Sequence, residues 1–121
     1  MIIISWVGDS LVSIQAREEP EDEEDDDDVE DFFISVPKHN GENPREAMRI
    51  YKHGGETRQG KFDKRSKIYQ RTRMYPGVQV TRSLGDLIAH HIGVTSEPQF
   101  VVHDIAKADA FMTIATDSVW K

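Results

Sequence analysis

The sequence has no cysteine and no apolar run long enough to span a membrane. The absence of cysteine excludes disulfides and thiolate zinc sites, and it is compatible with a reducing compartment. The apolar start, residues 1–4, is short and lacks the basic and small-residue flanks of a signal peptide. We therefore expect a cytoplasmic or nuclear protein without membrane attachment.

Apolar residues are also scarce. Of the 121 residues, 37% are hydrophobic and 31% are charged, which is hydrophilic for a globular domain. One segment accounts for much of this charge, because 12 of the 14 residues from Glu18 to Asp31 are Asp or Glu. Without those 12 charges, the formal net charge of −7 becomes +5. Like charges at this density repel one another and bury no apolar area, so we predict a solvated low-complexity insertion at residues 17–31.

The first residues have the pattern of a fully buried strand, which residues 1–7 would form. Core strands seldom begin at a native N-terminus, so we expect the chain to start inside a longer protein. Residues 11–15 alternate like a second strand, and residues 8–10 have the composition of a turn. Together these segments predict a β-hairpin.

Further strands are predicted at residues 32–36, 78–81, 99–102 and 111–115. A helix is predicted to begin with Asn43 as N-cap and Pro44 at the first helical position, and to end near His53 before the stop at Gly54. A short helix is predicted within residues 84–92, whereas residues 56–75 show no period. This irregular order favours an α+β fold with a mostly antiparallel sheet and helices packed outside it.

Two aspartates follow apolar strands, and both are candidate metal ligands. Asp9 follows residues 2–7 through a glycine, and Asp117 follows residues 111–115. Carboxylates held at strand ends along one sheet edge would suit Mg²⁺ or Mn²⁺, which prefer oxygen ligands. The alternative is that both side chains make ordinary turn hydrogen bonds, because Asp is common in turns.

The histidines and serines carry weaker signals. The five histidines share no helix face at a ligand spacing, which favours exposed or capping roles over metal binding. The serines lack the Gly-x-Ser-x-Gly pattern of a nucleophile elbow. Neither residue type predicts a catalytic site.

A basic segment is a stronger candidate for binding. From Arg45 to Arg82 there are 11 Lys or Arg residues against three acids, a local charge of +8. Aromatic residues alternate with these bases, a pattern that suits a phosphorylated protein or nucleic acid. Pairing with the acidic segment of the same chain is the alternative. The candidate substrate-contacting residues are Arg58, Lys61, Arg65, Arg71 and Arg73.

Five motifs, in order, resemble those of the PPM-type, or type 2C, metal-dependent Ser/Thr protein phosphatases. Residues 7–10, "VGDS", resemble the family's "VGDSR" turn, and residues 43–55, "NPREAMRIYKHGG", resemble the helix and double glycine of its flap. Residues 76–86 resemble "PGLAVTRSLGD", residues 93–98 resemble "GVxSEPE", and residues 111–120 resemble "FLILATDGVW". The resemblance covers nearly the whole chain except the acidic insertion.

The resemblance implies a layered α+β sandwich of antiparallel sheets flanked by helices, incomplete in this chain, with a flap-like basic segment at residues 37–76. It also implies a site for two Mn²⁺ or Mg²⁺ ions that activate water for attack on a phosphoserine or phosphothreonine of a protein substrate. By position, Asp117 is similar to a ligand of the two core metals and Asp9 to a ligand of a third, weaker metal. This partner class makes nucleic-acid binding the less favoured interpretation.

The chain also departs from the family's pattern. The upstream Asp-Gly-His-Gly motif, the downstream Asp-Asn motif and the phosphate-binding arginine are absent. Ser118 replaces a glycine, and Lys121 stands where an acid is usual. We therefore predict that this chain is part of a metal-dependent protein Ser/Thr phosphatase and that it is inactive alone. The alternative is a pseudophosphatase that serves as a protein-interaction or structural module.

Overall fold

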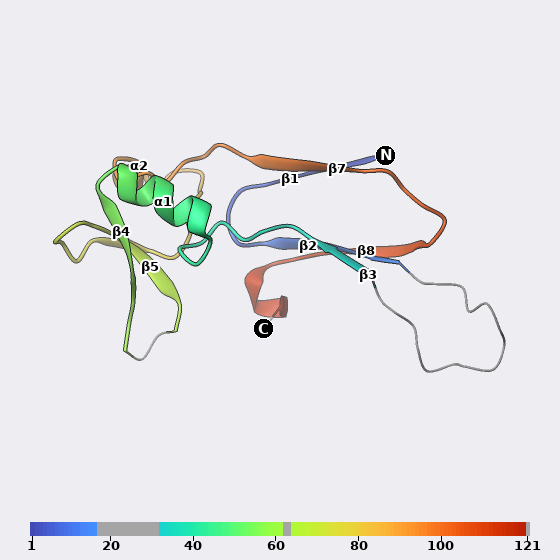
Figure 1. Cartoon of the computed structure of the whole chain (residues 1–121), viewed down its shortest axis with the longest axis horizontal. Helices are drawn as coiled ribbons and strands as arrows, with labels where there is room; N and C mark the ends of the chain where they lie inside the picture. Colours follow the sequence, from blue (N-terminus) through green and yellow to red (C-terminus); the bar gives the residue numbers. More distant parts are fainter. Residues whose placement is uncertain (17–31, 62–63, 121) are drawn as a thin grey trace. The chain divides into compact units, whose positions relative to one another are not determined.

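The computed structural model describes residues 1–16, 32–61 and 64–120. They divide into two compact units: unit 1 contains the described residues of Met1–Ile4, Ser10–Val36 and Phe100–Lys121, and unit 2 contains those of Ser5–Asp9 and Pro37–Gln99. The elements, drawn in Figure 1, are β1 (Ile2–Trp6), β2 (Leu11–Ala16), β3 (Phe32–Ser35), α1 (Pro44–Lys52), β4 (Gly55–Gln59), β5 (Ser66–Gln70), β6 (Pro76–Val78), α2 (Leu87–His90), β7 (Gln99–His103), β8 (Asp109–Ala115) and the 3₁₀ helix η1 (Asp117–Trp120). The predicted acidic insertion at residues 17–31 lies outside the described residues.

Unit 1 is built on a three-stranded antiparallel sheet in the order β3-β2-β8. In this sheet Ser13 is opposite Ser35 on one side and Thr113 on the other. Val12, Ser13 and Ile14 are all buried, and because successive side chains of a strand point to opposite faces, both faces of β2 are covered there. The strands predicted at residues 32–36, 99–102 and 111–115 are confirmed.

The predicted hairpin of residues 1–15 is wrong. β1 pairs with β7, whereas β2 pairs with β3 and β8. Between the two strands, the Gly8 backbone N–H donates to His39 Nδ1 (3.1 Å) and the Gly8 carbonyl accepts from the His39 N–H (3.0 Å). The alternation of residues in a sequence indicates strands but not which strands pair, and here β1 and β2 belong to different sheets.

Helix α1 in unit 2 begins and ends where the sequence predicts. The Asn43 side chain accepts a hydrogen bond from the Arg45 N–H (3.1 Å), Pro44 occupies the first turn, and the C-cap is His53. Gly54 then adopts φ +81°, a left-handed conformation that favours glycine. The boundaries could be predicted because each depends on residues next to one another in the sequence.

Unit 2 also contains the antiparallel sheet β4-β5-β6. Its core is a cluster of buried apolar residues, Ile50, Ile68, Ala89, Ile92 and Val94, with Val78 packed against it. Residues 56–75, for which the sequence predicts no element, contain β4 and β5, which form a hairpin. Only Ile68 in β5 is fully buried, so an alternation of Lys and Tyr with a single core residue gave too weak a signal.

The predicted α+β class, with antiparallel sheets and two α-helices in the described residues, is confirmed. None of the helices in the described part of the chain has the length and apolar character needed to cross a membrane.

Candidate functional site

A buried carboxylate, that of Glu46 in α1, connects three segments of unit 2. Glu46 is 2% exposed. Arg49, one turn along the helix, donates to both carboxylate oxygens at 2.9 and 2.7 Å. Arg82 Nη2 donates to Oε1 at 2.8 Å, and the Thr81 hydroxyl donates to Oε2 at 2.7 Å. The two guanidinium groups and the hydroxyl thus satisfy both oxygens of this carboxylate.

The pKa of Glu46 is held well below its usual range. Burial alone would raise this pKa, but the hydrogen bonds from Arg49, Arg82 and Thr81 outweigh burial. The carboxylate is therefore ionised at neutral pH and compensates the charge of two half-buried or buried guanidinium groups.

The two arginines extend the network to the backbone. Arg49 donates from Nε to the Gly93 carbonyl (2.9 Å) and from Nη2 to the Thr81 carbonyl (2.7 Å). Arg82 donates from Nη1 to the Glu97 carbonyl (2.8 Å). Helix α1 is thereby joined to residues 81–82 and 93–97, the segments that resemble two separate phosphatase motifs.

His39 holds the turn that precedes Asp9. His39 is completely buried, and its ring stacks on Trp6 with centroids 5.5 Å apart. Because Nδ1 accepts from the Gly8 N–H, the ring proton lies on Nε2, which donates to Gln99 Oε1 (2.8 Å). Burial lowers the pKa of His39, in keeping with a neutral ring. The prediction of an exposed or capping role is therefore wrong for His39, although His53 does cap α1.

The two aspartates predicted as metal ligands belong to different units. Asp9 is half-buried and follows Gly8, whose φ is +105°, in unit 2. Asp117 is half-buried in unit 1. It is the first residue of η1, and one residue separates it from the end of β8. Near it, the Trp120 indole donates to the Ala115 carbonyl (3.0 Å), which fixes the short helix against the end of β8.

Within the described residues, no group of three or more His, Asp or Glu side chains is arranged to hold a metal ion. Oxygen-coordinated Mg²⁺ or Mn²⁺ needs several ligands around one point. The described residues therefore do not fit a complete metal site. Lys121, which departs from the family's sequence pattern four residues after Asp117, lies outside the described residues.

The five predicted substrate-contacting residues lie on or beside the β4–β5 hairpin. The guanidinium group of Arg58 lies over the Tyr69 ring at 5.1 Å, that of Arg71 over Tyr51 at 4.5 Å and that of Arg73 over Tyr75 at 5.6 Å. Arg58 also donates to the Arg73 carbonyl (3.0 Å), which brings two of the five together. Arg65 donates to Gln79, and Lys61 is exposed, two residues beyond the end of β4.

The buried network was not predicted. Glu46 and Arg82 are 36 residues apart, so no local pattern connects them. The spacing of Glu46 and Arg49, three residues apart on a helix, was the only available signal for their pairing. That His39 is buried could not be predicted either, because its partners Gly8 and Gln99 lie 31 and 60 residues away.

Comparison with known proteins gives consistent matches. The sequence model described as "Protein phosphatase 2C" matches residues 2–121. Two relatives from Arabidopsis thaliana, "Probable protein phosphatase 2C 61" and "Probable protein phosphatase 2C 72", are 27% and 32% identical over 98% of this chain. The chain spans 35% and 34% of their lengths, about a third of each relative.

Solved structures have a similar fold. A serine-threonine phosphatase 2C from Toxoplasma gondii superposes with a TM-score of 0.76 at 20% identity, over 98% of this chain and 38% of that chain. A sex-determining protein from C. elegans gives a TM-score of 0.70, also at 20% identity, over 98% of this chain and 24% of that chain. These two likenesses concern the fold.

Proposed function

The chain belongs to the protein phosphatase 2C family, and we propose that it forms the central and C-terminal part of a metal-dependent protein Ser/Thr phosphatase domain. The family resemblance seen in the sequence motifs is confirmed. The observation that carries the proposal is the family match over residues 2–121, which includes the strand end that bears Asp117. When bound in a complete domain, Mn²⁺ or Mg²⁺ would supply the activated water for phosphoester hydrolysis.

This chain's own contribution would be ligands and supports. Asp117 would provide one carboxylate to the core metals, and Asp9 would provide one to a third, weaker metal. His39 would hold the turn that carries Asp9, through its two hydrogen bonds to Gly8. Because the described residues do not fit a complete metal site, we propose that the chain alone does not hydrolyse phosphoesters.

The direct test is incubation of the chain with Mn²⁺ and a phosphothreonine peptide, with release of phosphate as the measurement. We expect no turnover above that of buffer. Turnover that Asp117→Ala abolishes and Asp104→Ala preserves would contradict the proposal, because Asp104 is an exposed acid of unit 1 outside the motif.

A second candidate function is that of a pseudophosphatase acting as a protein-interaction module. It is favoured by two observations: the described residues contain no group of three or more His, Asp or Glu side chains arranged to hold a metal ion, and unit 2 has its own buried core. The rest of the gene discriminates the two candidates. An upstream Asp-Gly-His-Gly motif and a downstream Asp-Asn motif would favour the phosphatase, and their absence would favour the interaction module.

A further inference from the structure

Thr81 is completely buried and hydrogen-bonded on every side. Its backbone N–H donates to the His39 carbonyl (2.8 Å), and its hydroxyl donates to Glu46 Oε2 (2.7 Å). Its carbonyl accepts from Arg49 Nη2 (2.7 Å) and from the Thr95 N–H (3.3 Å). Thr81 therefore joins helix α1, which carries Glu46 and Arg49, to the segment that contains His39.

His39 continues this connection to the turn at residues 7–9. The His39 carbonyl accepts from Thr81, whereas the His39 N–H donates to the Gly8 carbonyl (3.0 Å). The Gly8 N–H donates in turn to His39 Nδ1 (3.1 Å). Both polar backbone groups of Gly8 are thus bonded to one residue, which is itself bonded to Thr81. Asp9 is the next residue of this turn.

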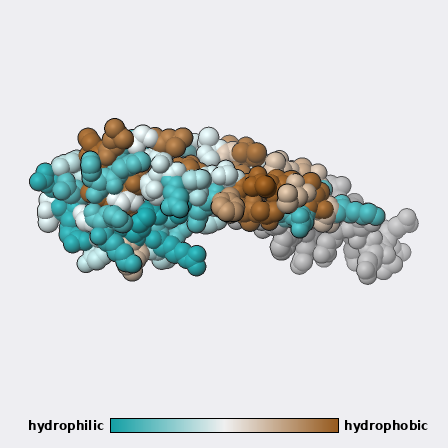
Figure 2. All heavy atoms as spheres, turned by 90° about the horizontal axis from the view of Figure 1, so that it is seen from above, coloured by the Kyte–Doolittle hydropathy of each residue, from teal (hydrophilic) through white to brown (hydrophobic). Residues whose placement is uncertain are grey.

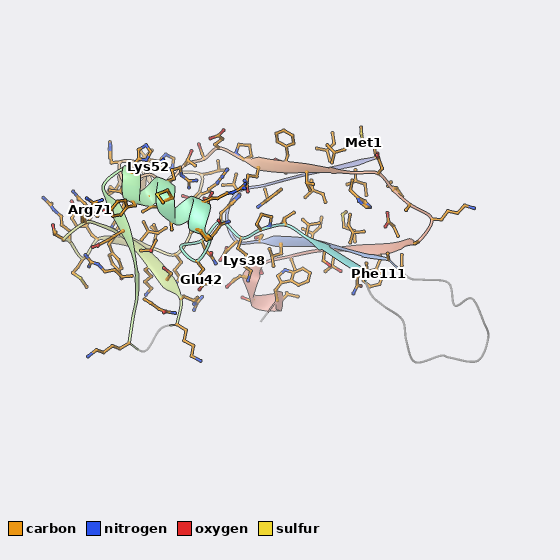
Figure 3. The ribbon with its side chains drawn as sticks, in the orientation of Figure 1. Met1, Lys38, Glu42, Lys52, Arg71 and Phe111 are labelled. Atoms are coloured by element: carbon orange, nitrogen blue, oxygen red, sulfur yellow. The ribbon has the colours of Figure 1, made fainter. Side chains whose placement is uncertain are left out.

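The loop that leads into α1 also pairs with the residues before Thr81. Asn40 and Val80 form an antiparallel bridge, which fixes the register of the two segments. This loop runs from Lys38 to Glu42, both labelled in Figure 3. The bridge supports the neighbouring backbone hydrogen bond of Thr81, because paired segments move together.

All of these contacts lie within unit 2, which contains Ser5–Asp9 and the described residues of Pro37–Gln99. Thr81 and His39 are 0% exposed and Glu46 is 2% exposed. Water does not reach these groups to replace a broken hydrogen bond, so breaking one leaves a buried polar group unpaired at a high cost. The position of one group in the connection therefore restricts the position of the next.

From these contacts we propose that Thr81 is a positioning residue for the turn that carries Asp9, and that it ties this turn to Glu46 in α1. Thr81 acts on Asp9 through His39 and Gly8. A role in catalysis rests on the proposed function, in which Asp9 belongs to the site, whereas the coupling itself does not.

The first test measures amide hydrogen exchange in the unaltered chain at low concentrations of urea. We expect the amide protons of Gly8, His39 and Thr81 to exchange with the same opening free energy and the same dependence on urea, because the three donors belong to one connected set of bonds. Exchange of the Gly8 amide through an opening that leaves Thr81 protected would overturn the proposal.

The second test removes the Thr81 hydroxyl. Thr81→Val keeps the shape of the side chain and removes the donor to Glu46. We expect the Gly8 amide to exchange faster by about tenfold relative to the Ile92 amide, which donates to the Ala89 carbonyl (3.0 Å) in the core of the same unit. A general loss of stability would accelerate both amides equally, so their ratio reports positioning.

Two further variants complete this test. Thr81→Ser keeps the hydroxyl, and the ratio of Gly8 to Ile92 exchange should return to within about twofold of that in the unaltered chain. Thr57→Val is the matched control, because Thr57 is a half-buried threonine of β4 in the same unit. This control should change the ratio by less than about twofold.

Equal acceleration of the two amides in Thr81→Val would overturn the proposal, since Thr81 would then contribute only to general stability. The same conclusion would follow if the ratio in Thr81→Ser were as high as in Thr81→Val. If Thr81→Val does not fold, exchange in the unaltered chain and in Thr81→Ser decides. The measurements use neither metal nor phosphopeptide, so failure of the coupling is distinguishable from failure of the proposed phosphatase function.

Discussion

Glu46 compensates the charges of two arginines inside unit 2, so stability should be sensitive to its substitution. Sequence patterns predict residues that act through near neighbours, such as Asn43 at the start of α1. They do not predict Glu46 or His39, because the partners of these residues are brought close only by the complete fold. A buried charge needs compensating partners, and for Glu46 two of them, Thr81 and Arg82, are distant in the sequence. The sequence pattern therefore does not show that Glu46 is buried.

We predict that Glu46→Gln lowers the free energy of unfolding by about 3 kcal/mol, because two guanidinium groups lose their buried counter-charge. Urea denaturation measures the change. Glu42→Gln is the matched control, since Glu42 is exposed, and it should alter stability by less than about 0.5 kcal/mol. Equal effects of the two substitutions would contradict the role given to Glu46.

The same carboxylate predicts a dependence of stability on pH. Its folded-state pKa lies below the ordinary value of 4.5, so the unfolded chain binds the proton first as the pH falls. The contribution of Glu46 is complete above pH 4.5 and is lost progressively below it, toward the folded-state pKa. The difference in unfolding free energy between the unaltered chain and Glu46→Gln should therefore shrink on acidification below pH 4.5. A difference that grows in that range would refute this.

For His39 we predict a neutral ring with the proton on Nε2 at pH 7, and a titration midpoint below 6.5 in the folded chain. Burial causes the shift, and the Gly8 N–H would lose its acceptor if Nδ1 were protonated. Nitrogen chemical shifts from two-dimensional NMR of the imidazole measure both the tautomer and the midpoint. The urea-unfolded chain serves as reference, and a folded midpoint above the unfolded one would contradict the prediction.

Helix α1 and the β4–β5 hairpin differ in how well the sequence predicts them. The helix has an N-cap, a first-turn proline and a glycine stop, all local signals. The hairpin has charged or polar residues on most positions, and its place in the fold depends on one buried side chain, Ile68. A close approach also contributes: a Cβ at Gly55 would lie 2.6 Å from Ile50 Cγ2, so only glycine fits there. Tertiary packing, which single-sequence patterns do not contain, therefore defines the hairpin.

We predict that Ile68→Ala destabilises the chain by about 3 kcal/mol, because it removes a fully buried side chain from the centre of the unit 2 core. Thermal and urea denaturation measure the loss. Ile88→Ala, at a position 62% exposed, is the control and should cost less than about 1 kcal/mol. If Ile68→Ala cost no more than the control, β5 would not be part of the core.

Among the described residues, the strands of unit 1 leave apolar side chains exposed to solvent. In unit 1, Ile3 is 63% exposed, Phe100 71% and Val102 51%, and Figure 2 shows hydrophobic atoms gathered over the region of β1 and β7. The fold class could be predicted from strand spacing and motif order, but these exposed faces could not, because alternation does not reveal what covers each side.

We predict that the isolated chain binds a hydrophobic dye such as ANS and self-associates at high concentration, because contiguous exposed apolar faces favour both. The double variant Phe100→Ser/Val102→Ser should reduce dye fluorescence and self-association, measured by fluorescence titration and sedimentation. Its unfolding free energy should change by less than about 1 kcal/mol, since both side chains are more than half exposed. Ile105→Ser is the control, because Ile105 is equally exposed but lies in the connection between β7 and β8 rather than in a strand. An equal effect of the control, or none from the double variant, would mean that the exposed face of β7 does not cause the dye binding and self-association. A clear difference between the double variant and the control, with the unfolding free energy unchanged, would show that polar substitutions on β7 reduce self-association without destabilising the chain.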